Sequence, residues 1–219
     1  MICDAHCHLD LMDNMLEIIE EMRNFNINLF AVGTTPKAYD REIRFCKNSP
    51  YIKVGLGLHP QLISSGYDDM NLFKELFERS HYIGEVGLDF SKEYIHTREK
   101  QIHVFYDIVN LCEKYGEKVV SVHSLKSASK VIELLRECKT QKSNKYILHW
   151  FTGTMSQLKK AIELGCYFSI NPSMLKTKSG LEVINTIPVE RMLLETDAPF
   201  TFKIQHAGEI ETEIKRLVL

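Results

Sequence analysis

Two histidines separated by one residue stand near the start of the chain, at the end of a short apolar run. His6 and His8 belong to residues 2–9, a segment typical of a β-strand. Alternate residues of a strand point to the same face, so both imidazoles should project into one space. Two imidazoles with a carboxylate nearby suit a divalent metal ion. Two histidines that hold no ligand are the alternative, and the rest of the chain must decide between them.

A carboxylate and further candidate ligands occur in later apolar runs. Glu85 lies within Tyr-Ile-Gly-Glu-Val-Gly-Leu, where a lone carboxylate is costly to bury. A Lys or Arg partner would satisfy it, and so would two metal ions bridged by its two oxygens. The nitrogen and oxygen ligands suit Zn²⁺, Mn²⁺ or Mg²⁺ without choosing among them. The predicted ligands are His6, His8 and Asp197 for one ion, His123 and His149 for the other, and Glu85 for both.

The elements that would position these residues alternate along the whole chain. Eight short apolar runs, each followed by a segment of helical periodicity, predict eight strand–helix pairs. Eight pairs favour an α/β fold of the closed (β/α)₈ TIM-type barrel class over an open doubly wound sheet, because no glycine-rich phosphate fingerprint follows the first strand. The expected strands are residues 2–9, 28–33, 51–59, 82–89, 118–123, 146–151, 166–171 and 191–196.

A barrel of this kind places its active site at the carboxyl ends of the strands. The candidate ligands all fall at or near such ends, as does His59 in Gly57-Leu58-His59-Pro60. One histidine at a strand end is commonly a packing residue. Convergence of several histidines and carboxylates from separate strands is hard to obtain by chance, so the sequence predicts a metal site there.

Composition and charge restrict the class of protein. With 219 residues, 44% hydrophobic residues and a net charge of −2, the chain is typical of a globular protein and has no general attraction to nucleic acid. A nucleic-acid substrate would need a local basic patch, or metal ions, to meet its phosphates. Lys176 and Lys178, after the seventh strand, could contribute to such a patch or could be solvated loop lysines. Six scattered cysteines, with no signal peptide and no membrane span, predict a cytoplasmic protein with one domain over residues 1–219.

Six stretches in order along nearly the whole chain resemble the TatD-type metal-dependent deoxyribonucleases of the amidohydrolase-like barrel superfamily. The resemblance implies metal-dependent hydrolysis of DNA phosphodiester bonds, exonucleolytic on single strands or frayed ends. It implies that the six ligand residues bind metal, that Glu85 and Asp197 act in catalysis with Asp197 accepting a proton from the attacking water, and that His59 contacts a substrate phosphate. The matching stretches are residues 4–10, 57–60, 84–89, 122–124, 148–153 and 194–199.

Four shorter stretches resemble, more narrowly, the TatD-type nuclease of the bacterial Qat antiphage defence system. This implies a role in antiphage defence and partner proteins from the same operon. The chain departs from the family in a shorter loop after Asp89 and in the lack of an arginine-containing segment after Pro199. Both departures border the site and bear on substrate choice. The four stretches are residues 8–11, 34–36, 58–62 and 171–175.

Two other functions compete with a nuclease. The first is an amide or ester hydrolase of the same superfamily, but many of those bridge their metals with a modified lysine where this chain has Glu85. The second is a weakly active or non-catalytic assembly subunit of a defence complex, against which the full ligand set argues. Asp89 could orient a ligand or cap a loop, Glu195 is interpreted as support for a ligand, and Trp150 could stack on a base or, more in keeping with its position, pack at a strand end.

Overall fold

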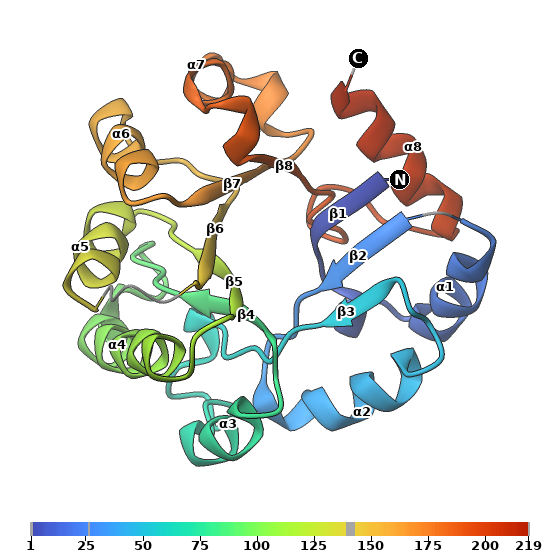
Figure 1. The fold of residues 1–219 in the computed structure, drawn as a ribbon, viewed down its shortest axis with the longest axis horizontal. Coiled ribbons are helices and arrows are strands. Elements are labelled where there is room, and N and C mark those ends of the chain that lie inside the picture. Colours follow the sequence, from blue (N-terminus) through green and yellow to red (C-terminus); the bar gives the residue numbers. More distant parts are fainter. Residues whose placement is uncertain (1, 26, 139–142, 219) are drawn as a thin grey trace.

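The computed structural model describes residues 2–25, 27–138 and 143–218, in which parallel strands alternate with helices around a closed ring (Figure 1). This confirms the predicted TIM-type barrel. The strands are β1 Ile2–Cys7, β2 Ile27–Ala31, β3 Ile52–Val54, β4 Tyr82–Gly87, β5 Val119–His123, β6 Lys145–His149, β7 Tyr167–Ile170 and β8 Met192–Leu194. The helices are α1 Met15–Glu21, α2 Pro36–Cys46, α3 Met70–Phe77, α4 Arg98–Tyr115, α5 Ala128–Cys138, α6 Met155–Glu163, α7 Lys178–Thr186 and α8 Ala207–Val218.

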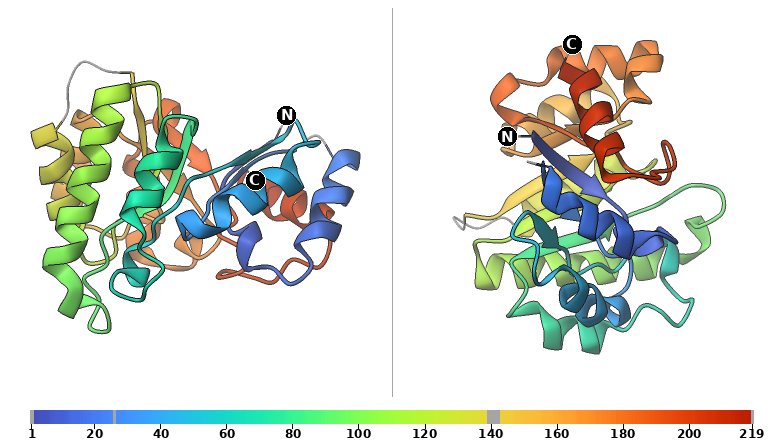
Figure 2. Two further views of the ribbon diagram at one scale, coloured as in Figure 1. Left: turned by 90° about the horizontal axis from the view of Figure 1, so that it is seen from below. Right: turned by 90° about the vertical axis from the view of Figure 1, so that its right-hand side faces the viewer.

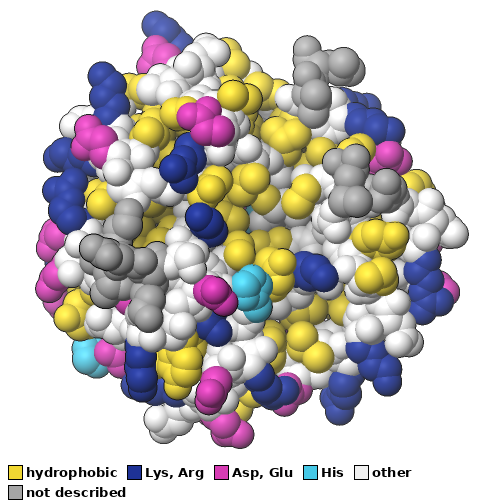
Figure 3. Space-filling model, in the orientation of Figure 1, with side chains coloured by type: hydrophobic (Ala, Val, Ile, Leu, Met, Phe, Trp, Pro, Cys, Tyr) yellow, Lys and Arg dark blue, Asp and Glu magenta, His cyan; other side chains and the backbone are white. Residues whose placement is uncertain are grey.

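The helices form an outer layer around the strands (Figure 2), and their apolar side chains are buried against the barrel. In α4, for example, Phe105, Ile108 and Cys112 are buried against the barrel. Figures 1 and 3 look onto the face at which the strands begin, where hydrophobic side chains gather in the middle. The strands therefore end on the far face. Within the described residues, no helix combines the length and the apolar character needed to cross a bilayer.

The strands form two hydrogen-bonded sets, β1–β2–β3 and β4 to β8, and the first junction between them lies at β3 and β4. The main chain of Leu56 bridges to Ile83, whereas the expected strand 51–59 is regular only over β3. Glycines explain this difference, because the main chains approach too closely for side chains. A Cβ atom on Gly57 would lie 1.6 Å from the carbonyl oxygen of Gly33, just beyond β2, and one on Gly55 would lie 2.6 Å from the carbonyl oxygen of Gly84 in β4.

The second junction joins the last strand to the first through a buried carboxylate. Asp4 is fully buried, and it accepts hydrogen bonds from the Thr196 amide (3.0 Å) and the Thr196 hydroxyl (2.6 Å). One residue further, the Asp197 amide donates to the carbonyl oxygen of His6 at 2.9 Å. These bonds align the ends of β1 and β8, and thereby set His6 and Asp197 side by side.

One acidic side chain lies in the interior without a partner. Glu42 is 2% exposed on the inner stripe of α2, between Tyr39 and Cys46. Neither of its carboxylate oxygens has a hydrogen-bond partner among the described residues. Burial, with a smaller contribution from the charge of Asp10, raises the pKa of Glu42 to about 8. Glu42 is therefore protonated at neutral pH.

We predict that Glu42 makes the protein less stable as the pH rises. The pKa is about 8 in the folded protein and 4.5 ordinarily, so the folded state holds an extra proton between these values. The free energy of unfolding should then fall by up to about 1.4 kcal/mol per pH unit in that window. Glu42→Gln mimics the protonated acid and should remove this component.

Denaturant unfolding of both proteins across the window measures the effect. Glu75→Gln, at an exposed position of α3, is the matched control and should keep the wild-type slope. Identical pH dependences for wild type and Glu42→Gln would contradict the assignment of a buried, protonated Glu42.

Candidate metal centre

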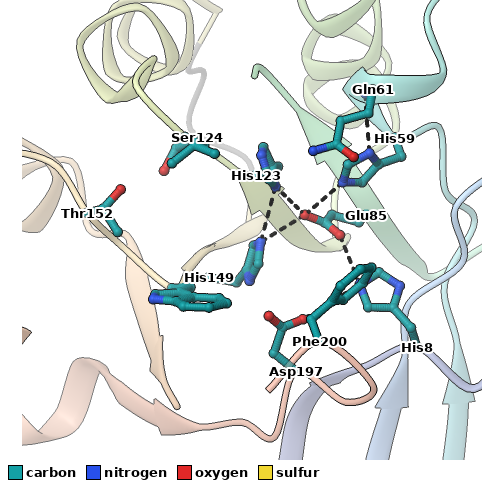
Figure 4. A pocket seen from close by; sticks show the side chains of 12 residues that line it. His8, His59, Gln61, Glu85, His123, Ser124, His149, Thr152, Asp197 and Phe200 are labelled. Carbon is teal, nitrogen blue, oxygen red and sulfur yellow. Dashed lines mark hydrogen bonds and ion pairs between the residues drawn. The ribbon is translucent and has the colours of Figure 1, made fainter. Parts of the chain in front are cut away.

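The predicted ligands meet in one cavity at the carboxyl ends of the strands (Figure 4). The cavity has a volume of about 440 Å³, within the range of small-molecule sites. It lies on the face opposite to that shown in Figure 3. The residues that line it are His8, His59, Gln61, Glu85, His123, Ser124, Leu125, His149, Trp150, Thr152, Asp197 and Phe200. His6 is buried directly beneath, in contact with His8 and His149.

Glu85 is the centre of the cluster and is 1% exposed. Its two oxygens face different groups of imidazoles. Oε2 lies 3.4 Å from His6 Nε2 and 3.2 Å from His8 Nε2. Oε1 lies 2.7 Å from His123 Nδ1 and 2.8 Å from His149 Nε2. Within the described part of the chain, no Lys or Arg forms an ion pair with Glu85. The alternative prediction, a salt bridge from Glu85 to a Lys or Arg, is therefore wrong.

The Oε2 side has the dimensions of a metal site. The His6 and His8 Nε2 atoms are 3.1 Å apart, and Asp197 Oδ1 lies 3.7 Å from each. Four ligands held about 2.0–2.1 Å from one ion in a tetrahedron are about 3.3–3.4 Å apart. Asp197 Oδ1 is buried and has no hydrogen-bond partner among the described residues. An unpaired carboxylate oxygen at this spacing fits a cation.

The Oε1 side is a second group of the same kind. Besides their contacts to Glu85, His123 Nδ1 and His149 Nε2 lie 3.4 Å apart. His59 Nε2 is also close, 3.3 Å from Glu85 Oε1. His59, Glu85 and His123 therefore form a second set of side chains that could hold a metal. Distance alone does not tell whether His59 or His149 completes this group.

Each imidazole has one nitrogen that faces Glu85 and one that points away from it, here called the outer nitrogen. The partner of the outer nitrogen indicates whether the other nitrogen can bind a metal or donates a hydrogen bond. A neutral imidazole that donates from one nitrogen offers the lone pair of the other to a metal. The outer nitrogens of His6, His8, His123 and His149 each face an oxygen that can accept a proton. Two of these oxygens are within hydrogen-bond distance, Ser121 Oγ at 2.7 Å from His6 and Asp89 Oδ2 at 3.2 Å from His123. Asp10 Oδ1 at 3.9 Å from His8 and Glu195 Oε1 at 3.7 Å from His149 face the rings from beyond that distance.

His59 has the opposite arrangement. Its outer nitrogen, Nδ1, accepts a hydrogen bond from the backbone amide of Gln61 at 3.3 Å. The proton of the neutral ring is then on Nε2, which points into the cavity toward Glu85. A protonated nitrogen has no lone pair for a metal. The geometry thus makes His59 a hydrogen-bond donor and leaves His149 as the better ligand.

The electrostatics of the cluster favour bound positive charge. Burial alone would raise the pKa of Glu85, but His59, His149 and His6 hold it well below its usual range. Burial raises the pKa of Asp197. The pKa of His149 is raised well above its ordinary value because the charges of Glu85 and Glu195 outweigh its burial. The charges of Glu85 and Glu195 thus favour a positive charge on His149, whereas burial lowers the pKa of His6 to about 3 and keeps that imidazole neutral, with a lone pair for a metal.

Residues around the cluster fix its side chains. Glu195, expected as support for a ligand, faces His149 and accepts hydrogen bonds from Asn171 Nδ2 at 3.0 Å and from the Ser169 hydroxyl. Asp89 accepts from Gln61 Nε2 at 2.8 Å as well as facing His123. Asp89 fits both of its predicted interpretations, because its Oδ2 faces His123 and its Oδ1 accepts the Ser91 amide at 2.8 Å and caps the following loop. Glu195 Oε1 faces His149 Nδ1 at 3.7 Å.

Some supporting residues were not identified from the sequence. Ser121 shares strand parity with His123, and this signal could have placed it in the barrel interior. Gln61 follows His59 in a loop, where no periodicity indicates direction. The supporting role of Asp10 depends on the turn after β1, where strand parity no longer holds.

Of the other residues singled out in the sequence, Trp150 lines the cavity, whereas the two lysines and Cys7 do not. Lys176 and Lys178 are exposed after β7 and do not line it, so their contact with DNA stays a prediction. Trp150 lines the cavity while also packing on the core. Cys7 points into the core, away from its histidine neighbours, as strand alternation predicts.

Comparisons with known proteins agree on one family. The family model described as TatD related DNase matches residues 3–216. Human deoxyribonuclease TATDN3 is 28% identical over 217 residues, which cover 90% of this chain and 78% of that protein. The uncharacterized metal-dependent hydrolase YabD of Bacillus subtilis is 27% identical over 209 residues, with 91% and 81% covered.

A solved structure shares the fold. The crystal structure of YJJV, a TatD homolog from Escherichia coli K12, superposes with a TM-score of 0.81 at 20% sequence identity. The match covers 99% of this chain and 90% of the E. coli chain. At this level of identity the likeness supports the barrel fold.

We predict that metal binding distinguishes His149 from His59. His149→Ala removes a lone pair from the Oε1 side and should lower the bound metal or weaken its affinity by at least about 10-fold. His59→Ala removes only a donor and should leave the metal content unchanged. Elemental analysis and isothermal titration with Zn²⁺ and Mn²⁺ measure both variants. His96→Ala, at an exposed position, is the control. Equal losses of metal in His59→Ala and His149→Ala would refute the assignment from the outer nitrogens.

Proposed function

Because the chain belongs to the TatD-related DNase family of metal-dependent hydrolases, we propose that it hydrolyses phosphodiester bonds of DNA at the Glu85 cluster with two divalent ions. The observation that carries this proposal is the division of the Glu85 oxygens between two groups of ligands. Ions bound on both sides would supply Lewis acidity and lower the pKa of a water molecule. Zn²⁺, Mn²⁺ and Mg²⁺ all suit the mixed nitrogen and oxygen ligands.

The side chains divide the ligand roles by position. His6, His8 and Asp197 would hold one ion, His123 and His149 the other, and Glu85 both. Asp89 supports this division because a carboxylate can only accept, which places the proton of neutral His123 on Nε2 and leaves Nδ1 for a metal. Ser121 Oγ contacts His6 Nδ1, the nitrogen that points away from Glu85. The side chains would then need little rearrangement when metal binds.

Two groups contact the reacting atoms in this proposal. The Asp197 carboxylate borders the cavity; with Oδ1 toward the ion, its second oxygen would accept the proton of an attacking water. His59 Nε2 points into the cavity with its proton, so it can donate to a non-bridging phosphoryl oxygen. A neutral His59 suits this role, since burial lowers its pKa. Lys176 and Lys178 would contact phosphates further along the strand.

The proposed bridging role of Glu85 also argues against the competing function of an amide or ester hydrolase. Amide and ester hydrolases of this superfamily often bridge their metals with a modified lysine, and β4 supplies Glu85 instead. The bridge therefore favours a phosphodiesterase.

We predict that Glu85→Gln abolishes DNA cleavage. An amide keeps the shape of the side chain but loses the charge and the second metal-binding oxygen. The loss of cleavage activity should be larger than the loss of about 10–100-fold that is typical when a residue supporting a metal ligand is substituted. Cleavage of single-stranded DNA with Mg²⁺, Mn²⁺ or Zn²⁺ measures it, and Glu75→Gln is the control. Cleavage by Glu85→Gln at the wild-type rate would overturn the proposal, and so would a wild-type protein that binds metal and leaves DNA intact while it cleaves amides or esters.

We further propose that the activity serves antiphage defence in the bacterial cytoplasm, as one domain over residues 1–219 with partners from the same operon. The support is the resemblance of residues 8–11, 34–36, 58–62 and 171–175 to the Qat TatD-type nuclease. Co-expression with the neighbouring genes in a bacterial host should lower phage plating, and Glu85→Gln should restore it. Unchanged plating with the wild-type operon would contradict this role.

A further inference from the structure

The cavity has an apolar wall that the proposed chemistry does not use. Leu125, Trp150 and Phe200 line it, and each follows closely on a candidate ligand in the sequence. The wall is therefore attached to the same strand ends as the metal centre. Ser124 and Thr152 lie on the side of the cavity away from His59 in Figure 4, and each carries a hydroxyl.

Phe200 is the most exposed part of this wall. It is 64% exposed, and its ring stands edge-on to the His8 ring, with centroids 5.2 Å apart and planes at 87°. The Phe200 amide donates to the carbonyl oxygen of Asp197 at 2.9 Å. This turn places Phe200 beside the cavity. Most of its ring surface is open, and Phe200 is not among the side chains that pack in the core.

Trp150 faces the cavity through an unusual backbone conformation. Adjacent strand residues point to opposite sides, and Trp150 directly follows His149. Its φ of +38° breaks this alternation, so that both side chains reach the cavity. Trp150 is half-buried and packs against the core on its other side. It offers a supported aromatic surface beside the Oε1 group of ligands.

We propose that Trp150 and Phe200 form a subsite for an unstacked nucleobase of the nucleotide next to the phosphate that is cut. This inference rests on the proposed hydrolysis of DNA and names how the strand is held. The cavity joins a cluster suited to a phosphate with an aromatic wall, and its volume of about 440 Å³ accommodates a nucleotide. Stacking on aromatic side chains accepts every base, because each base has a π-face.

The subsite would favour single-stranded DNA over base pairs inside a duplex. A base inside a duplex is stacked on both faces and paired along one edge, so it cannot lie on Trp150 or Phe200. The enzyme would then need a single strand or a frayed end. The hydroxyls of Ser124 and Thr152 could bond to the sugar or the base edge without imposing a sequence.

The test compares two substrates of equal length and charge. One is a short oligothymidylate, and the other is the same phosphodiester chain with abasic tetrahydrofuran residues. Base stacking on an aromatic side chain corresponds to about 5- to 150-fold in affinity. The wild type should cleave the abasic chain with a kcat/KM lower by a factor in this range.

Phe200→Ala should lower kcat/KM on oligothymidylate and leave the abasic chain unaffected, and Phe200→Tyr should restore the wild-type ratio. Val189→Ala, at an apolar side chain that is 82% exposed, is the matched control. Equal cleavage of both chains by the wild type would overturn the subsite. So would a Phe200→Ala variant that loses activity equally on both.

A second measurement separates this inference from the proposed function. Trp150 is the only tryptophan of the chain, so its fluorescence reports directly on the wall. Oligothymidylate should quench it and the abasic chain should not, with or without cleavage. If neither chain is cleaved, the proposed function fails, and quenching by oligothymidylate alone still supports the subsite. Absence of quenching at saturating oligothymidylate overturns the subsite even if DNA is cleaved.

Discussion

A carboxylate buried at the end of a barrel needs positive charge, and the geometry around Glu85 follows from that need. The side chain is 1% exposed, and imidazoles face both of its oxygens. A salt bridge to Lys or Arg would have satisfied the charge and left no room for chemistry. Histidines satisfy it only while they carry a proton or share a metal, so the cluster is a site for exchangeable cations. Ser121 Oγ and Glu195 Oε1 face the nitrogens of His6 and His149 that point away from Glu85.

The barrel keeps this cluster together at its two junctions. The hydrogen bonds of Asp4 to Thr196 align the end of β8 with β1 and set Asp197 beside His6. At the other junction, close glycine contacts bring β4 against β3 and place Glu85 in the middle. The relative positions of ligands that are distant in sequence thus depend on closure of the ring. A substitution at either junction would alter the metal centre even though the substituted residue does not contact it.

The sequence predicted the parts of this site that periodicity controls. His6 and His8 share a face because strands alternate, and eight strand–helix units indicate a barrel that gathers strand ends in one place. The shortening of β3 was not predictable from hydropathy, because it depends on main-chain contacts between Gly33 and Gly57. The sequence left Trp150 open between stacking on a base and packing at a strand end for a similar reason. The side chain of Trp150 points inward because its φ is positive, and the rule that side chains alternate along a strand does not predict this.

Anomalous diffraction from crystals grown with Mn²⁺ or Zn²⁺ would test the account of Glu85 most directly. We expect two peaks about 3.5–4 Å apart, one on each side of the carboxylate, with His149 within bonding distance of the second peak. His59 should lie outside bonding distance of both. A single peak with only one Glu85 oxygen as ligand, or a peak bound by His59, would contradict the account.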